Sequence, residues 1–163
     1  MEAQKTTFFV GTTDRNLEKA VAIYHLDENT GDMELFKRTK GGIRPGYLAL
    51  SNDKNFLFAV SSENFEGLEN EQSINAFRIN DEVSDLSHVN QQPSRGKNPT
   101  HISVNPVYDI VYAANYNSGS VVSYAFDENG RLSPPLSSFQ HEGSGPNADR
   151  QKGPHAHYIH PSM

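Results

Sequence analysis

The sequence predicts an all-β fold built from repeated antiparallel sheets of four strands each. Three observations lead to this prediction: two segment types recur in a fixed order, the strand-like segments alternate in polarity, and Asn and Gly occupy the turns between them. No stretch combines a helical spacing of apolar residues with a capping residue and a stop signal. We therefore expect strands and turns throughout the chain of 163 residues.

The first recurring segment opens after a proline and runs into a strand dense in apolar residues. Residues 41–64 read GGIRPGYLALSNDKNFLFAVSSEN, and residues 95–118 read RGKNPTHISVNPVYDIVYAANYNS, which places Pro99 54 residues after Pro45. A third copy opens with KGPHAHYIHP, where Pro154 follows Pro99 by 55 residues. Strands with this apolar and β-branched content are typical of sheets that are covered on both faces.

The second recurring segment is an alternating strand, a polar turn and a further short strand. It occurs three times, as AVAIYHLDENTGDMEL, SINAFRINDEVSDLS and SVVSYAFDENGRLSPP. In the third copy Val122, Tyr124 and Phe126 point to one face, because successive side chains of a strand alternate between its two faces. The turns DENTGD and DENG place Asn and Gly where a positive φ is needed. Together the two segments give four strands in a repeat of roughly 50 residues.

Four-stranded repeats of this length are typical of the blades of a β-propeller. The alternative is a β-sandwich in which the hairpins resemble one another by accident. The propeller is favoured because two different segments recur in the same order at the same spacing. We expect a single partial propeller domain over 1–163, with about three blades and one strand of a fourth. The expected boundaries are about 6–40, 41–94 and 95–142 for the three blades, and about 150–163 for the start of the fourth.

The composition limits the classes of partner and of site. The formal net charge is −6 and no Lys/Arg cluster is present, which argues against nucleic acid as the main partner. A small anionic ligand needs only one or two local cations and remains compatible with this charge. The chain has no cysteine, so disulfides, zinc–thiolate sites and cysteine nucleophiles are excluded. The N-terminus lacks the apolar core of a signal peptide, and no membrane-spanning stretch is found; we expect a cytoplasmic protein without a membrane partner.

Three motifs in chain order resemble the lactonase family of seven-bladed β-propellers. RPGYLALSNDKNFLFAVSSE looks like the second blade of that family, and NPTHISVNP with ANYNSGSVVSYAFDENGRL looks like its third. GPNADRQKGPHAHYIHP is similar to its strongest motif, an Arg-Gln pair followed by Pro-His-Ala-His. The resemblance covers nearly the whole chain and about the N-terminal half of a family member. It implies part of a seven-bladed propeller that hydrolyses a small anionic sugar lactone, with 6-phosphogluconolactone of the oxidative pentose phosphate route as the expected substrate, and it implies no metal or organic cofactor.

Opening a lactone requires a general base for the attacking water and a group that stabilises the developing oxyanion. Histidine titrates near neutral pH and suits the first role, whereas arginine suits the second role or the binding of a phosphate. His155 and His157 are two residues apart and therefore share one face of an extended strand, which in a propeller lines the channel. We expect one of these two histidines to be the catalytic base and Arg150 to be the anion ligand. A zinc site on His-x-His is the alternative, but it lacks a third ligand in the motif.

Three further residues are candidates for binding the substrate. Gln151 belongs to the Arg-Gln motif, and His101 opens the counterpart strand of the third blade, where it aligns with His157 if one insertion is allowed and with Ala156 if none is. Its alternative is a core histidine bonded to the backbone. Asn115 ends a strand and can contact the substrate or hold a turn.

Two other functions stay open at this point. A propeller can bind a protein or a ligand without chemistry, because the fold hosts many unrelated functions. The chain can also be an inactive fragment, since the residues that the family supplies from later blades are absent from it. Three blades leave two open sheet faces and unpaired strand edges, which favour self-association.

Overall fold

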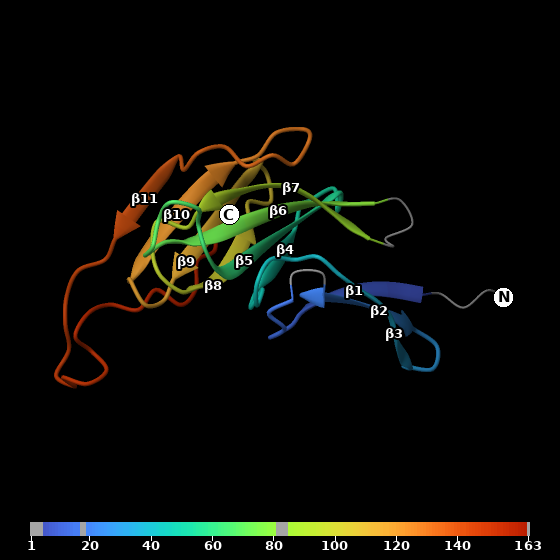
Figure 1. Cartoon of the computed structure of the whole chain (residues 1–163), viewed down its shortest axis with the longest axis horizontal. Coiled ribbons are helices and arrows are strands. Elements are labelled where there is room, and N and C mark those ends of the chain that lie inside the picture. Colours follow the sequence, from blue (N-terminus) through green and yellow to red (C-terminus); the bar gives the residue numbers. More distant parts are fainter. Residues whose placement is uncertain (1–4, 17–18, 81–84, 163) are drawn as a thin grey trace.

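The computed structural model describes residues 5–16, 19–80 and 85–162. Over these residues it contains eleven β-strands, arranged in three antiparallel sheets that follow one another along the chain (Figure 1). The predicted all-β class is therefore confirmed. Within the described ranges, no helix has the length and apolar character that crossing a membrane requires.

Each sheet is a meander in which strands that are neighbours in sequence pair with one another. The first sheet consists of β1 (Lys5–Gly11), β2 (Val21–Asp27) and β3 (Met33–Thr39). The second sheet consists of β4 (Leu48–Leu50), β5 (Phe56–Asn64), β6 (Gln72–Ile79) and β7 (Leu86–Pro93). The third sheet consists of β8 (Pro99–Val104), β9 (Ile110–Asn115), β10 (Ser120–Ala125) and β11 (Ser137–Gln140). The second and third sheets have the four strands that the repeat predicts.

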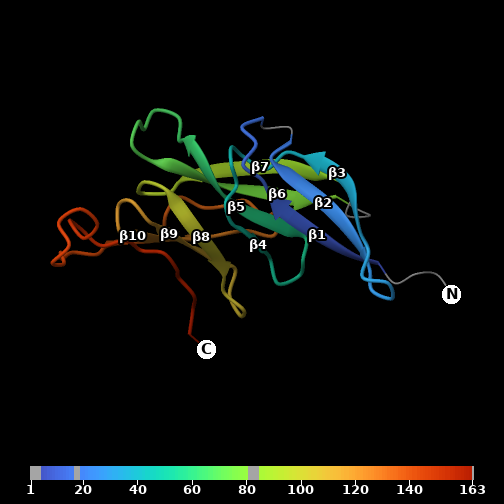
Figure 2. The same cartoon turned by 90° about the horizontal axis from the view of Figure 1, so that it is seen from below.

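The sheets fan out from a common inner edge, as propeller blades do. The first strands β4 and β8 pack against each other, whereas β11 lies at the opposite edge of its sheet from β8 (Figure 1). Figure 2 shows the sheets from below. The first sheet has three strands in the described part of the chain. In sequence β1 corresponds to β5 and β9, so this sheet holds the counterparts of the three outer strands, and the described residues contain no inner strand beside β1.

Apolar side chains between adjacent sheets hold the blades together. The larger cluster lies between the second and third sheets, where Phe58 contacts Phe126 with 4.9 Å between ring centroids. A smaller cluster lies between the first and second sheets and includes Val21, Leu57 and Phe77. Alternation along each strand supplies both clusters, because β5 and β6 present apolar side chains on both faces of the second sheet.

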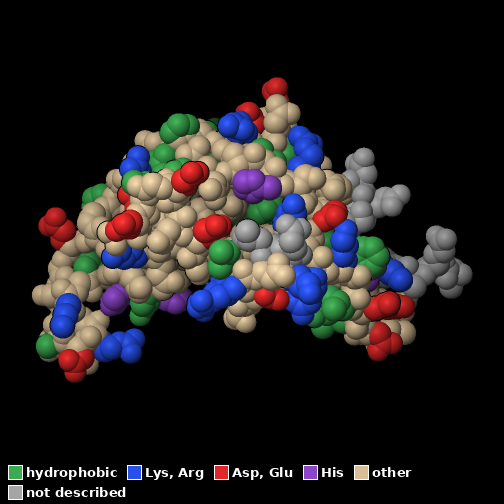
Figure 3. Space-filling model, viewed as in Figure 1, with side chains coloured by type: hydrophobic (Ala, Val, Ile, Leu, Met, Phe, Trp, Pro, Cys, Tyr) green, Lys and Arg blue, Asp and Glu red, His purple; other side chains and the backbone are tan. Residues whose placement is uncertain are grey.

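Polar contacts support the same stacking of sheets. Asp85, just before β7, accepts hydrogen bonds from Lys37 Nζ at 2.6 Å and from Thr39 Oγ1, both on β3. These two donors lower the pKa of Asp85 to about 2. Asn52 Nδ2 donates to Asn105 O at 2.8 Å and joins the second sheet to the third. On the face seen in Figure 3, basic and acidic side chains are interspersed and form no continuous patch of one sign.

The predicted turns form in the same way in the first and third sheets. Asp27 Oδ1 accepts from the amide of Asn29 at 2.8 Å, and Asp127 Oδ1 accepts from the amide of Asn129 at 2.9 Å. The glycine that closes the second of these turns, Gly130, has a φ of 76°, and a Cβ there would lie 2.2 Å from the Phe56 ring. A side chain at this position would therefore be strained and would also collide with the neighbouring sheet.

Candidate active site

The histidine-rich motif lies in an extended segment that runs beside the third sheet. Ser103 Oγ, on β8, donates to the carbonyl oxygen of Ile159 at 2.8 Å. The segment also passes close to Gly119, just before β10. A Cβ at Gly119 would lie 2.3 Å from the carbonyl oxygen of Pro154, so only glycine allows this approach. Residues 150–162 form no strand in the structure. Their assignment as the opening of a fourth blade stays a prediction.

His155 is held at both of its ring nitrogens by backbone carbonyls. Its Nδ1 lies 2.9 Å from Tyr116 O and its Nε2 lies 3.0 Å from Arg150 O. The imidazole also stacks on the Tyr116 ring, with 4.5 Å between centroids and 16° between planes. A carbonyl oxygen only accepts, so both contacts are hydrogen bonds only when both nitrogens carry a proton. In this arrangement His155 has no nitrogen available to remove a proton from water, and it joins the loop before it to the end of β9.

His157 meets the same tyrosine in a different way. Its ring lies edge-on to Tyr116, with 5.5 Å between centroids and 89° between planes. The side chain is exposed, and its nitrogens hydrogen-bond to no residue in the part of the chain that the structure describes. An imidazole with a free nitrogen can accept a proton from water, which is what a general base must do. Of the two predicted histidines, His157 is therefore the one whose geometry suits a base.

Arg150 and Gln151 lie in the turn that leads to the histidines. Asn147 Oδ1 accepts from the Arg150 amide at 3.1 Å, and Gln151 Oε1 accepts from the Asn147 amide at 3.0 Å. The backbone of Arg150 thus reaches His155, while its exposed guanidinium makes no ion pair or hydrogen bond with the described residues. The Arg150 guanidinium is open to solvent, and the Gln151 side chain stabilises the turn.

His101 is buried, with 4 % of its surface exposed, and lies between two tyrosine rings. The ring centroids are 4.3 Å apart for Tyr47 and 4.1 Å apart for Tyr158. Its Nδ1 accepts from the amide of Ile159 at 3.4 Å, so His101 contacts the histidine-rich segment through Tyr158 and Ile159. These contacts are those of a core histidine bonded to backbone, and they support the segment that carries His157; substrate binding by His101 stays a prediction.

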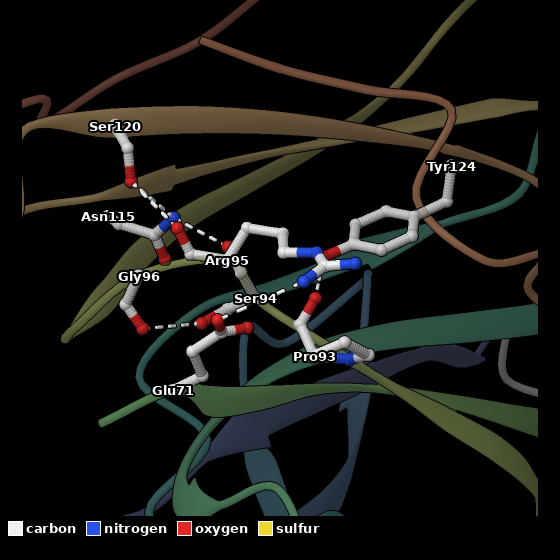
Figure 4. A network of polar contacts seen from close by, with 8 residues as sticks. All are labelled: Glu71, Pro93, Ser94, Arg95, Gly96, Asn115, Ser120 and Tyr124. Atoms are coloured by element: carbon white, nitrogen blue, oxygen red, sulfur yellow. Dashed lines mark hydrogen bonds and ion pairs between the residues drawn. The ribbon is translucent and has the colours of Figure 1, made fainter. Parts of the chain in front are cut away.

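Asn115 lies in a buried polar network between the second and third sheets (Figure 4). Its Nδ2 donates to Ser94 O at 2.7 Å and to Ser120 Oγ at 3.0 Å. These bonds tie the end of β9 to the linker that follows β7, and contact of Asn115 with the substrate stays a prediction. It directly precedes Tyr116, the residue that contacts both histidines. Within the described ranges, no group of three His, Asp or Glu side chains is arranged to hold a metal ion.

Residues 7–162 match the sequence model of the family described as Lactonase, 7-bladed beta-propeller. The chain belongs to this family. Lactonase relatives include two named 6-phosphogluconolactonase: one from Bacillus subtilis is 29 % identical over 150 residues, and one from Formosa agariphila is 27 % identical over 150 residues. These matches cover 92 % and 91 % of this chain but 41 % and 42 % of the relatives, so the chain spans about two fifths of their length.

The crystal structure of a protein from Bacteroides fragilis, described as a 6-phosphogluconolactonase, has the same blade arrangement. It superimposes with a TM-score of 0.80 at 26 % sequence identity, over 93 % of this chain and 40 % of the solved one. The predicted partial propeller is therefore confirmed by the strands, by the lactonase family match and by the superposition.

Sequence reasoning did not single out Tyr116, although this residue organises the lactonase motif. Its ring contacts both His155 and His157, and its carbonyl accepts from His155. The available signal was positional: Tyr116 directly follows β9, the apolar strand of the blade that precedes the histidine motif. Sequence reasoning also missed Tyr158. Its contact with His101 depends on how two inner segments approach each other, which the sequence does not show.

The stability of this lactonase chain is expected to fall in mild acid through His101. Burial lowers the pKa of His101 below its ordinary value of 6.5, and the nearby His160 and His157 lower it further. The unfolded chain therefore binds a proton at a higher pH than the folded chain does. The contribution of neutral His101 is complete above pH 6.5 and is lost as the pH falls through the lower folded-state pKa.

The melting temperature, measured by thermal unfolding between about pH 7.5 and about pH 5, tests this expectation, because the range includes the ordinary pKa of histidine. His101→Phe keeps a ring between the two tyrosines and removes the titrating group, so its melting temperature should depend less steeply on pH. His141→Phe changes an exposed histidine and serves as the control. Equal pH slopes for wild type and His101→Phe would contradict the assignment.

Proposed function

We propose that the chain provides part of the active site of a sugar-lactone hydrolase that acts on 6-phosphogluconolactone. The observation that carries the proposal is the exposed His157 imidazole, which has free nitrogens and lies edge-on to Tyr116 on the segment that follows Arg150. The relatives named 6-phosphogluconolactonase support the choice of substrate. A cytoplasmic location is part of the same proposal.

The chemistry assigns one proton acceptor and one anion ligand. A water molecule attacks the lactone carbonyl carbon while a His157 ring nitrogen takes one of its protons, and the carbonyl oxygen becomes an oxyanion. When the oxyanion collapses, the bond between the acyl carbon and the ring oxygen breaks, and the His157 imidazolium returns the proton to that leaving oxygen. The product is the open-chain hydroxy acid. Arg150 binds the phosphate of the substrate through its guanidinium, and His155 holds the loop that carries Arg150.

The role of Arg150 is tested by comparing two lactones. We expect Arg150→Ala to raise the KM for 6-phosphogluconolactone about tenfold or more and to leave hydrolysis of unphosphorylated gluconolactone unchanged, because a charge-assisted contact to phosphate is lost. Arg131→Ala removes an exposed arginine in the turn after β10 and is the matched control. Equal effects of Arg150→Ala on both lactones would contradict a phosphate-binding role.

Self-association through the free faces of the first and third sheets is a further prediction. Phe8 and Val10 on β1, and Leu136 and Phe139 near the edge of the third sheet, are 39 %, 44 %, 57 % and 61 % exposed. Exposed apolar side chains on terminal sheets favour association. Light scattering on the purified chain should give a mass above the 18.1 kDa of one copy. A stable species of single-chain mass at high concentration would show that these faces do not associate.

A further inference from the structure

A pocket lies where the linker after β3 meets the second sheet, on the side of that sheet that faces the first. Its volume is about 260 Å³. It is lined by the linker that leaves β3 and by side chains of β5, β6 and β7: Lys40, Gly42, Glu63, Asn75, Phe77, His88 and Gln91. None of the residues of the candidate active site lines it.

The internal repeat shows what fills the equivalent space one blade later. Phe77 pairs with Leu57 in the second sheet as Tyr124 pairs with Val111 in the third, so Phe77 and Tyr124 are counterparts. The Tyr124 hydroxyl donates to Pro93 O at 2.7 Å and closes the interface between the second and third sheets (Figure 4). Phe77 has no hydroxyl to make that contact.

The linker before the second sheet also lacks a side chain that the linker before the third sheet has. Residues 39–45 read TKGGIRP and residues 93–99 read PSRGKNP, which aligns Gly41 with Arg95. Arg95 extends over the second interface, where its Nη1 lies 4.0 Å from Glu71 Oε1 (Figure 4). At the first interface the aligned residue is Gly41, which has no side chain. Both groups that occupy the second interface, the phenol and the guanidinium, are therefore missing from the first.

A buried polar side chain lines the pocket without a role in packing. Asn75 is 3 % exposed and stands where the third sheet has Val122, because Ala59 pairs with Asn75 as Ala113 pairs with Val122. Its Nδ2 donates to Ser73 Oγ at 3.2 Å, while its Oδ1 accepts from no residue within the described ranges. An apolar residue serves the fold at the counterpart position, and the amide of Asn75 offers the pocket a polar group in its place.

The lining selects the chemical class of that partner. Glu63 only accepts hydrogen bonds and Lys40 only donates them, whereas the amides of Asn75 and Gln91 do both. Partial desolvation lowers the pKa of His88, which favours the neutral imidazole, and a neutral imidazole offers one donor and one acceptor. Hydroxyl groups satisfy all of these partners, since each donates and accepts, and the opposite charges of Glu63 and Lys40 favour a ligand without net charge. The Phe77 ring supplies an apolar wall of the kind that small-molecule pockets use.

We propose that the pocket between the first and second sheets binds a small uncharged polyhydroxylated molecule of monosaccharide size. This binding site is separate from the lactone site and does not depend on the chemistry proposed there. Two variants copy the third sheet into the second and are expected to close it: Phe77→Tyr adds the hydroxyl of Tyr124, and Asn75→Val adds the side chain of Val122. Both residues have a packed counterpart in this chain, so both variants are expected to fold.

The probe is D-glucose, titrated into the isotope-labelled chain while the NMR signals of the His88 ring and the Asn75 side-chain amide are followed. We expect saturable shifts of both signals in the wild type and at least about tenfold weaker binding in Phe77→Tyr and Asn75→Val. His157→Ala, which changes the candidate active site, should bind glucose as the wild type does. Thermal unfolding of each variant confirms that it is folded.

Three results would overturn the proposal. The first is the absence of saturable shifts at millimolar glucose in the wild type. The second is unchanged glucose binding in both closing variants, which would place the sugar elsewhere. The third is a response of the same signals to inorganic phosphate and not to glucose, which would make the pocket an anion site.

Discussion

Replacing His157 with alanine is expected to lower the rate of lactone hydrolysis about 10²- to 10⁴-fold, the usual contribution of a positioned general base. The expectation rests on the free ring nitrogens of His157 and on its edge-on contact with Tyr116, 5.5 Å between centroids. The loss should fall on kcat, because removal of the base leaves the phosphate contact of Arg150 in place. Steady-state hydrolysis of 6-phosphogluconolactone by wild type and variant measures it.

Two other histidine variants test whether the loss of activity is specific to His157. His160→Ala removes an exposed ring whose Nδ1 lies 2.8 Å from Pro161 O, and its activity should stay within about twofold of wild type. His155→Ala should raise KM, because the loop that carries Arg150 loses its anchor on β9. A wild-type kcat in His157→Ala together with a large loss in His155→Ala would exchange the two roles.

Truncation of Phe58 is expected to cost about 3–5 kcal/mol of unfolding free energy, the range for a buried phenylalanine replaced by alanine. Phe58 is fully buried at 0 % exposure, and its ring packs on Phe126 of the third sheet at 4.9 Å. The variant therefore opens a cavity at the contact between two blades. Urea unfolding of Phe58→Ala, followed by far-UV circular dichroism, measures the loss.

Val107→Ala is the control for this measurement, since Val107 is 75 % exposed and should change the unfolding free energy by less than about 0.5 kcal/mol. A loss below about 1 kcal/mol in Phe58→Ala would mean that the second and third sheets do not pack as described.

The repeat was readable because its strands and turns are set by local rules. Alternation along SVVSYAF and the Asn-Gly turns place β10 and the first and third hairpins without knowledge of contacts. The first sheet departs from the four-strand repeat in its described part: Pro45 precedes β4 and Pro99 opens β8, whereas no proline lies before β1 in the sequence. That difference could be seen in the sequence as a shorter first repeat, but the sheet order was needed to show that the described residues place no strand on the inner side of β1.

The sequence predicted which residue types form the candidate site, but it did not predict which of the two histidines has free ring nitrogens. His155 and His157 are equivalent in a strand pattern, yet the carbonyls of Tyr116 and Arg150 occupy both nitrogens of the first. Backbone carbonyls carry no sequence signal, so no motif could distinguish the two histidines. Asn115 shows the same limit, since its partner Ser94 O is a backbone atom brought near only by the packing of two sheets.

The central claim is that this chain carries the base of a lactone hydrolase on the segment beside the third sheet, and ring opening of 6-phosphogluconolactone tests it most directly. Acid release by the purified protein should exceed the spontaneous rate measured in the same buffer, and His157→Ala should lower the enzyme-dependent part of that rate about 10²- to 10⁴-fold. Wild-type protein at the spontaneous rate, or equal acceleration by wild type and His157→Ala, would contradict the account.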